Sequence, residues 1–399
     1  MLTLQVGQCG NQLGRAFFSA LARDDDRVTG DATDFNGSAF FRASDPCARG
    51  ALNRPVARAV LVDMEPKVVA QCLSGNATTS SAHAAFAYDP RNVLTQQSGS
   101  GNNWALGYAG HGARLADALE DLLQRVGAHV SVWPTLVSQL YSPRSEVEQC
   151  DAVRGVLTLQ SVAGGTGSGL GSYLTEHVLR DAFPSALLLN AVVWPYASGE
   201  VIVQNYNALL TIASLTRAAD GVVGYKLLDI KTIPQMPPQS KQFTTHTWTG
   251  LLKHLHQMQI ANAPLEEGID WHIKLDTAHG RAYNRALASM LVLRGGSQVT
   301  SEAVDVTAFR DPAMYASWSL EPFTWFTSPR RFNAYDKSAT LISNSKALLP
   351  TLASTVDKAY EMFSHGAYTH QYARHGVDDA FFQEAFLQVD QVVRNYQTL

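Results

Sequence analysis

In the first half of the chain, short apolar runs alternate with segments of helical periodicity. Residues 2–6, LTLQV, alternate apolar and polar side chains and predict a strand. Gly7–Gln12 follows and is predicted to form a glycine-containing turn, after which apolar residues recur at helical spacing around Phe17 and Leu21. Strand, turn and helix in this order form the opening half of a β-α-β unit.

The same order of elements repeats along the chain. Three more aliphatic runs predict strands, at 57–62, 155–161 and 186–193. A helix is expected after the first run, following Asp63–Pro66, and helical patterns follow the other two runs at 170–183 and 204–217. Strands that alternate with helices predict an α/β fold with a largely parallel sheet covered on both faces.

The pattern changes after a proline-containing stretch at 221–242. We expect a helix at 247–262 and strands at 288–293 and 338–342, which form a smaller α+β middle domain, and an apolar stripe predicts a final helix from Phe381 to Tyr396. The aromatic residues of this half are predicted to pack in its core, namely Trp318, Phe323, Trp325 and Phe326. The predicted divisions are an α/β domain at 1–220, the middle domain at 221–350 and a C-terminal helical region at 351–399.

Composition adds few constraints. The formal net charge is -4 with a pI near 6.3, which indicates neither a nucleic-acid nor a membrane partner. The four cysteines form no C-x-x-C pair, so the sequence predicts no zinc site or disulfide framework, and reduced thiols fit the cytoplasm. We see no signal-peptide pattern and no apolar run of membrane-spanning length.

The strongest chemical signal is the glycine-rich segment Ala163–Gly169, AGGTGSG, between a predicted strand and a predicted helix. Glycines let backbone N–H groups approach an anion, and the helix N-terminus adds partial positive charge. Thr166 and Ser168 are candidate hydroxyl donors. The segment has neither the lysine of a P-loop nor the frame of a dinucleotide-binding turn. The alternative interpretation is a turn that serves only to pack strand against helix.

Ordered motifs elsewhere make the chain resemble the tubulin superfamily. GGTGSG is similar to the signature phosphate loop of that superfamily and its bacterial relatives. Further resemblances, in the family's order, are a first loop at 7–11, an acidic loop at 63–66, a third loop at 98–104 and a ribose-side loop and helix at 199–207. Phrases at 59–67, 199–207 and 250–255 resemble the delta branch most.

The resemblance implies GTP or GDP as ligand, with Mg²⁺. Gln8 and Cys9 would offer backbone N–H groups to the phosphates, Asp63 would orient the first loop, Glu65 would hold Mg²⁺ through water, and Glu200 would contact ribose. For Asp63 and Glu65 the alternative is that acidic residues favour a helix N-terminus. The complete set of expected binding residues is Gly7, Gln8, Cys9, Asp63, Glu65, Gly101, Asn102, Ser161, Gly164, Gly165, Thr166, Gly167, Ser168 and Glu200.

The resemblance also implies a cytoskeletal role. Its delta branch is associated with centrioles, basal bodies, triplet microtubules and cilia, so the expected partners are other tubulins and microtubule or centriole components. The first competing hypothesis, a dinucleotide oxidoreductase, needs a G-x-G-x-x-G turn that Gly7–Gly10 does not supply. The second is a scaffolding or regulatory protein that has lost nucleotide binding.

One departure from the family affects the expected chemistry. After Asp220 the family continues through base-contacting residues, a long central helix and a loop that carries its catalytic acid. Here Gly221–Gly224 is followed almost at once by Tyr225–Ile230, which resembles a strand of the middle domain. Either other segments fill the place of the helix, or the sequence is a splice variant, an annotation error or a nonfunctional product. We therefore assign no catalytic residue.

Overall fold

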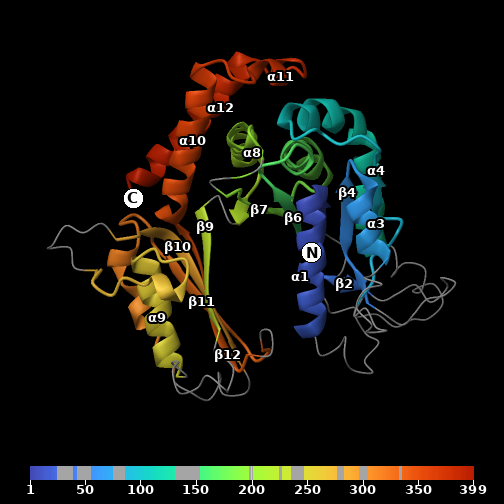
Figure 1. Cartoon of the computed structure of the whole chain (residues 1–399). Coiled ribbons are helices and arrows are strands. Elements are labelled where there is room, and N and C mark those ends of the chain that lie inside the picture. Colours follow the sequence, from blue (N-terminus) through green and yellow to red (C-terminus); the bar gives the residue numbers. More distant parts are fainter. Residues whose placement is uncertain are drawn as a thin grey trace, which may run out of the picture. The chain divides into compact units, whose positions relative to one another are not determined.

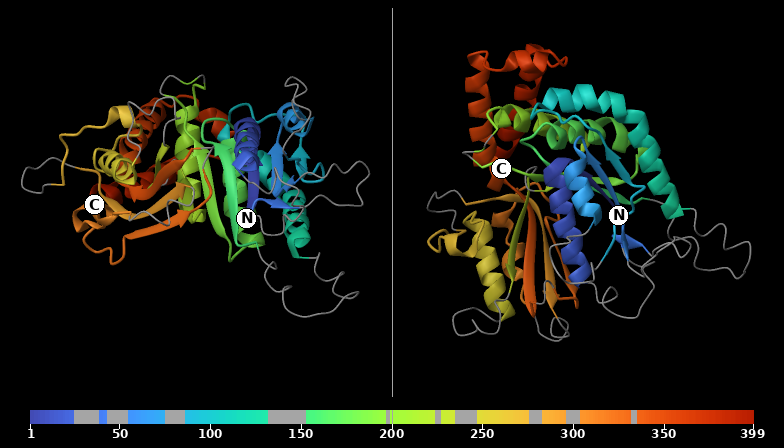
Figure 2. Two further views of the ribbon diagram at one scale, coloured as in Figure 1. Left: turned by 90° about the horizontal axis from the view of Figure 1, so that it is seen from below. Right: turned by 45° about the vertical axis from the view of Figure 1, so that its right-hand side comes forward.

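The computed structural model describes residues 1–24, 39–42, 55–74, 86–131, 153–196, 199, 201–223, 227–234, 247–275, 283–295, 304–331 and 335–399. The chain divides into two units (Figures 1 and 2). The first contains Met1–Val222 and Thr355–Val389, and the second contains Val223–Ser354 and Asp390–Leu399.

The first unit is built on parallel strands, which confirms the predicted α/β class. Their order is β5-β4-β1-β6-β7, and every neighbouring pair among them is parallel. Their bounds are β1 Leu2–Val6, β4 Ala59–Asp63, β5 Val93–Thr95, β6 Gly155–Ser161 and β7 Leu187–Val193. A short antiparallel pair joins β2 (Phe41–Arg42) to β3 (Val56–Ala57).

Helices follow these strands along the chain. Their bounds are α1 Gly7–Asp24, α3 Pro66–Ser74, η1 Leu106–Gly112 with α4 Ala113–Ser131, a helical segment η3-α6-η4-α7 from Thr166 to Ala182, and α8 Gln204–Ala218. The predicted turn at Gly7–Gln12 is wrong, because α1 begins at Gly7 directly after β1. Gly7 allows this abrupt change with a left-handed φ of 73°.

Apolar side chains cover both faces of the parallel strands. On one face Leu119 of α4 and Leu174 of η4 pack with Leu4 of β1. On the other face Phe18 of α1 and Leu61 of β4 belong to a second cluster. All five residues of β1 and all five of β4 are buried, as expected for strands between two helical layers.

The second unit contains a mixed sheet. Strand β12 (Lys337–Ser345) pairs antiparallel with β9 (Leu227–Pro234) and with β10 (Ala286–Gly295), and β10 pairs parallel with β11 (Phe323–Ser328). Helix α9 (Trp248–Ile260) begins after Thr247, whose hydroxyl accepts the Gly250 N–H. Short 3₁₀ helices complete the unit at Glu266–Gly268 (η6), Thr307–Arg310 (η9), Pro312–Met314 (η10) and Lys346–Leu348 (η11).

The prediction that four aromatic residues pack in the core of this half is wrong for three of them. The exposed fractions are 69% for Trp318, 57% for Phe326 and 37% for Trp325. Only Phe323 packs as expected, with its ring stacked on Phe309 at a centroid distance of 5.9 Å. β11 is the outermost strand in the order β11-β10-β12-β9, and most of its residues are exposed.

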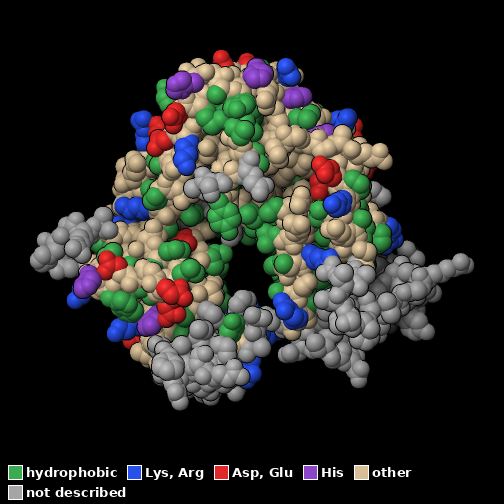
Figure 3. Space-filling model, viewed as in Figure 1, with side chains coloured by type: hydrophobic (Ala, Val, Ile, Leu, Met, Phe, Trp, Pro, Cys, Tyr) green, Lys and Arg blue, Asp and Glu red, His purple; other side chains and the backbone are tan. Residues whose placement is uncertain are grey.

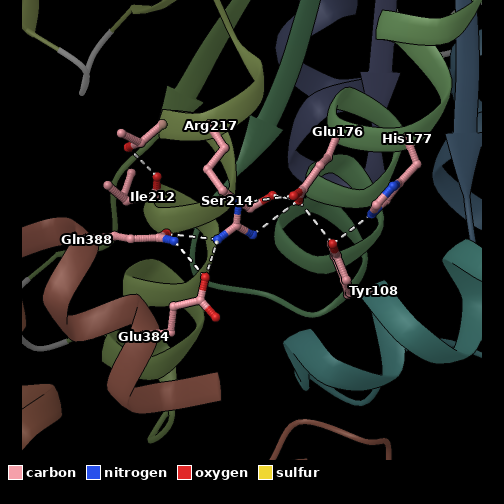
Figure 4. A network of polar contacts seen from close by, with 9 residues as sticks. Tyr108, Glu176, His177, Ile212, Ser214, Arg217, Glu384 and Gln388 are labelled. Atoms are coloured by element: carbon pink, nitrogen blue, oxygen red, sulfur yellow. Dashed lines mark hydrogen bonds and ion pairs between the residues drawn. The ribbon is translucent and has the colours of Figure 1, made fainter. Parts of the chain in front are cut away.

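The C-terminal helices are α10 (Leu349–Ser364), α11 (Thr369–Ala373) and α12 (Asp379–Gln397), and residues 355–389 belong to the first unit. Figure 4 shows how α12 is tied to that unit. Arg217 of α8 donates to Gln388 at 2.8 Å and pairs with Glu176 of η4 at 3.0 Å. The Ser214 hydroxyl donates to the same glutamate at 2.7 Å.

These partners control the ionisation of Glu176. Burial by itself raises the pKa of this carboxyl group, but hydrogen bonds from Arg217 and Ser214 outweigh burial, so that the pKa lies below its ordinary value. A carboxyl group with a lowered pKa in the folded state stabilises the fold above its unfolded pKa. That stabilisation is lost as pH falls through the folded pKa.

We predict that Glu176→Gln lowers the free energy of unfolding at neutral pH by about 1–2 kcal/mol, because Arg217, Ser214 and Tyr108 lose a charged acceptor. The difference from wild type should shrink as pH falls below the ordinary value of 4.5. Urea denaturation over a pH series measures this. The matched control is Glu384→Gln, whose side chain is 65% exposed and 3.9 Å from Arg217. If the loss of unfolding free energy in Glu176→Gln stays constant across the pH series, the charged form of Glu176 is not what stabilises the fold.

Candidate functional site

The loops of interest lie where the order of the parallel strands reverses. From β1 the chain first builds outward to β4 and β5, and then returns to place β6 and β7 on the other side of β1. Parallel sheets bind ligands outside the carboxyl ends of the strands at such a reversal. The first loop begins at Gly7, at the carboxyl end of β1, and the glycine-rich segment follows Ser161, at the carboxyl end of β6.

Three glycines of this segment pack closely against backbone atoms, and the closest is Gly169, where a Cβ would lie 2.1 Å from the Trp104 carbonyl oxygen. A Cβ on Gly165 would lie 2.7 Å from the Asn103 backbone nitrogen, and one on Gly7 would lie 2.9 Å from the nitrogen of Gly167. Gly167 itself lies against the backbone of Ser161, 3.2 Å from where its Cβ would be. The interpretation of these glycines as packing residues therefore holds for Gly165, Gly167 and Gly169.

Gly164 differs from its neighbours. The nearest heavy atom to a Cβ added there is the Asn102 side-chain oxygen, at 3.8 Å. Gly164 is only half-buried, and it precedes the N-terminus of the helical segment 166–182. Its backbone is thus open on one side, at the end of a helix where an anion is favoured.

Hydroxyl groups brace the segment. Thr166 Oγ1 lies 2.9 Å from Ser100 Oγ of the third loop. Ser168 is fully buried and donates to the Gly164 carbonyl, so its hydroxyl shapes the segment from inside. Ser161 Oγ accepts the Ala163 N–H at 3.2 Å.

The first turn of α1 supplies the first loop. Gln8 is exposed and Cys9 is half-buried, and backbone N–H groups in a first helical turn have no partner within the helix. Burial raises the pKa of the Cys9 thiol, which therefore stays protonated at neutral pH. Asn11 fixes this turn, because its side-chain amide donates to the carbonyls of Gly7 at 2.9 Å and Val62 at 3.1 Å.

The acidic pair stands at the end of β4. Asp63 is only 4% exposed, and burial raises its pKa to about 6 even though the backbone N–H groups of Glu65 and Met64 favour its charged form. Glu65 is exposed, and its carboxylate lies over Gly99 of the third loop. Mg²⁺ takes oxygen ligands and is commonly held by one or two carboxylates together with phosphates and waters. As a single exposed carboxylate at the end of a strand, Glu65 has the donor type that this chemistry requires. Among the described residues no group of three acidic, His or Cys side chains could hold a metal by itself.

The third loop turns sharply. Gly101 and Asn102 are both exposed and both left-handed, with φ of 53° and 55°. The next residue, Asn103, ends the turn and starts η1, because its side-chain oxygen accepts the N–H groups of Ala105 at 2.8 Å and Leu106 at 3.2 Å. The structure thus brings the third loop beside Gly164. Glu200 lies outside the described residues.

Asn207 is absent from the set expected from the sequence. It lies in the first turn of α8, fully buried, and its side-chain nitrogen donates to the carbonyls of Asn102 and Ala163, both at 2.7 Å. One amide therefore spans the third loop and the glycine-rich segment. The signal in the sequence was an asparagine inside the otherwise apolar helix Tyr206–Leu210.

Comparison with known families agrees with this arrangement. A model of the GTPase domain of the Tubulin/FtsZ family matches residues 1–132 and 140–227. The chain belongs to the tubulin family. Proteins of this family generally pair with other tubulins and with microtubule components, and membership makes the chain a cytoskeletal, GTP-binding protein.

Individual relatives give the same family and a finer comparison. The tubulin delta chain of Macaca fascicularis is 34% identical over 483 residues, with both chains fully covered. The tubulin epsilon chain of Mus musculus is 25% identical over 483 residues, covering all of this chain and 95% of the relative. The tubulin beta-1 chain of Colletotrichum graminicola is 27% identical over 455 residues, and the alignment covers all of this chain and 94% of the relative.

The delta-chain alignment is longer than this chain, which has 399 residues, so the relative has residues without a counterpart here. In the structure α8 ends at Ala218, β8 follows at Gly221–Val223 and β9 begins at Leu227. This short connection leaves no room for a long helix. Asp229, the first acidic residue after it, pairs with the buried Lys231.

Nucleic-acid-binding and membrane proteins require particular distributions of charge and of apolar helices. On the face drawn in Figure 3, basic and acidic side chains are interspersed and form no continuous basic patch. No helix in the described part of the chain is long and apolar enough to span a membrane.

Proposed function

We propose that the first unit binds the phosphates of GTP or GDP at the carboxyl ends of β1 and β6, between Gly164 and the first turn of α1. The observation that carries this proposal is the open backbone of Gly164 at a helix N-terminus, in a loop whose other glycines are packed tightly. Backbone N–H groups of Gly164–Thr166 and of Gln8 and Cys9 would face the phosphates. Both helices would contribute partial positive charge.

The remaining contacts are assigned by their position. Gly101 and Asn102 would close over the terminal phosphate from the third loop. Glu65 would hold Mg²⁺ through water, and the bound cation would favour the charged form of Asp63, which burial alone disfavours. Glu200 would contact the ribose hydroxyls, as the resemblance to the family implies.

We further propose a role of the delta-tubulin type in the cytoplasm, at centrioles or basal bodies and in cilium assembly, with other tubulins and centriole components as partners. The support is the identity of 34% to the Macaca fascicularis delta chain, against 25% and 27% to the epsilon and beta-1 chains above. The delta-like phrases at 59–67 and 199–207 include Asp63, Glu65 and Glu200, which are residues of the proposed site.

Gly164→Ala tests the phosphate site. The added methyl meets no protein atom closer than 3.8 Å, so the fold should be kept while the methyl blocks close approach of a phosphate. We predict that the Kd for GTP rises about tenfold or more, as expected for losing one charge-assisted hydrogen bond. Isothermal titration calorimetry measures the Kd, and circular dichroism checks the fold.

The matched control is Gly268→Ala, which also adds a methyl in open space, in the second unit. It should bind GTP like wild type. Wild-type affinity in Gly164→Ala would show that phosphates do not bind there. Gly165 and Gly167 are poorer test positions, because larger residues there would meet backbone atoms and disturb the loops.

A second prediction concerns the base. The resemblance places guanine recognition in the segment for which this chain has no counterpart, so few polar groups should be left to distinguish guanine from adenine. We expect the affinities for GTP and ATP to differ by less than about tenfold, measured by competition binding. A preference for GTP above about a hundredfold, near 2.7 kcal/mol, would mean that base recognition is intact.

A third prediction concerns location. The fluorescently tagged full chain, expressed in ciliated cells, should concentrate at centrioles or basal bodies. Its position is compared with centriole and microtubule markers by microscopy. Uniform labelling along cytoplasmic microtubules would contradict a delta-type role.

A further inference from the structure

The polar contacts of Asn207 extend beyond the two loops. Its side-chain nitrogen donates to the carbonyls of Asn102 and Ala163. Its side-chain oxygen accepts the backbone N–H of Trp104 at 3.1 Å and the hydroxyl of Tyr372 at 2.7 Å. All four partners lie in the first unit, and one buried amide therefore joins the third loop, the glycine-rich segment and α11.

Tyr372 is the contribution of the C-terminal helices to this cluster. It is fully buried, and its ring packs edge-on against Tyr206 at 5.6 Å and Phe382 at 5.3 Å. Burial raises the pKa of its hydroxyl, which stays protonated and can act only as donor to the Asn207 oxygen at neutral pH.

A second bond connects α11 to the same loop. The side-chain nitrogen of Asn103 donates to the carbonyl of Gln371 at 3.1 Å. Asn103 also starts η1 through its side-chain oxygen, as described above. Both polar links of α11 to the loops thus run through asparagines whose other atoms fix the backbone of the third loop.

These hydrogen bonds couple the position of the loops to the position of α11. Asn207 has no exposed surface, so a hydrogen bond lost there cannot be replaced by bulk water. A ligand that fixes the backbone of Asn102 and Ala163 also fixes the amide that they hold. The position of that amide determines where the Tyr372 hydroxyl finds its acceptor.

We propose that Asn207 and Tyr372 form a latch through which nucleotide in the loops and docking of α11 stabilise each other. Both are positioning residues, because their polar atoms bond protein groups and need not touch the ligand. The inference rests on the proposed nucleotide site and adds its regulation: coupling is reciprocal, so a partner that displaces α11 weakens nucleotide binding.

Tyr372→Phe tests the latch with little change in packing. The ring stays and only the hydroxyl is removed. Amide hydrogen exchange of the segment 369–382 is measured by mass spectrometry on the full chain, without and with saturating GTP. In wild type we expect GTP to slow exchange at 369–373 about fivefold or more, the lower range of typical coupling. In Tyr372→Phe the ratio of the exchange rates without and with GTP should fall toward one. The Kd for GTP should rise about two- to tenfold.

Tyr206→Phe is the matched control. Its hydroxyl donates to the Ala367 carbonyl at 3.0 Å, so the variant loosens the same segment without removing a bond to either loop. Exchange at 369–373 should rise equally with and without GTP, which leaves the ratio as in wild type. A purely structural role of Tyr372 would make the two variants behave alike.

The outcomes separate the two proposals. If wild type binds GTP and α11 shows no change in exchange, the latch is wrong and the nucleotide site stands. If Tyr372→Phe keeps the wild-type ratio, or if Tyr206→Phe loses it too, the latch is also wrong. If wild type binds no GTP, the nucleotide site and the latch both fail. Circular dichroism and thermal melting confirm that each variant is folded.

Discussion

Three loops of the first unit approach one another more closely than side chains allow, and the candidate site depends on that contact. The Gly165 backbone lies against the third loop, and Gly7 lies against Gly167. With Cβ atoms at these positions the loops would have to separate. The N-terminus of the helical segment 166–182 would then no longer meet the first turn of α1, and two sources of partial positive charge would be apart. Gly164 is the position at which a ligand can approach the backbone, because nearby glycines such as Gly165 are packed against other protein atoms.

Buried asparagines hold this contact in place by donating to backbone carbonyls on both sides of it. Asn11 joins the first loop to the end of β4, and Asn207 joins the third loop to the glycine-rich segment. An asparagine side chain can donate and accept at once, which suits loops that offer both carbonyl and N–H groups. The extension of this arrangement to Tyr372 is what connects the site with the C-terminal helices.

The sequence predicted the elements whose pattern is local. Strand β6 was expected at 155–161 and spans Gly155–Ser161, and α8 was expected at 204–217 and spans Gln204–Ala218. The pattern of apolar residues in each can be recognised within the segment itself, so no tertiary contact is needed to predict them. The glycine-rich segment was identified for the same reason, since its composition and its place between strand and helix are visible in a few residues.

Features that depend on distant partners were missed. Gly7 was interpreted as part of a turn, although one left-handed residue is enough for α1 to begin at once. The aromatic residues around β11 were assigned to a core because hydrophobicity alone does not show which strand of a sheet is outermost. Asn207 and Tyr372 are 165 positions apart, and no local pattern indicates that they meet.

The most direct test of the central claim is an experimental structure of the chain with Mg²⁺ and a slowly hydrolysed GTP analogue. The account predicts phosphate oxygens within hydrogen-bond distance of the backbone nitrogens of Gly164–Thr166 and of Gln8 and Cys9, with Glu65 beside the cation. Phosphates bound elsewhere, or a site that stays empty at saturating analogue, would contradict it.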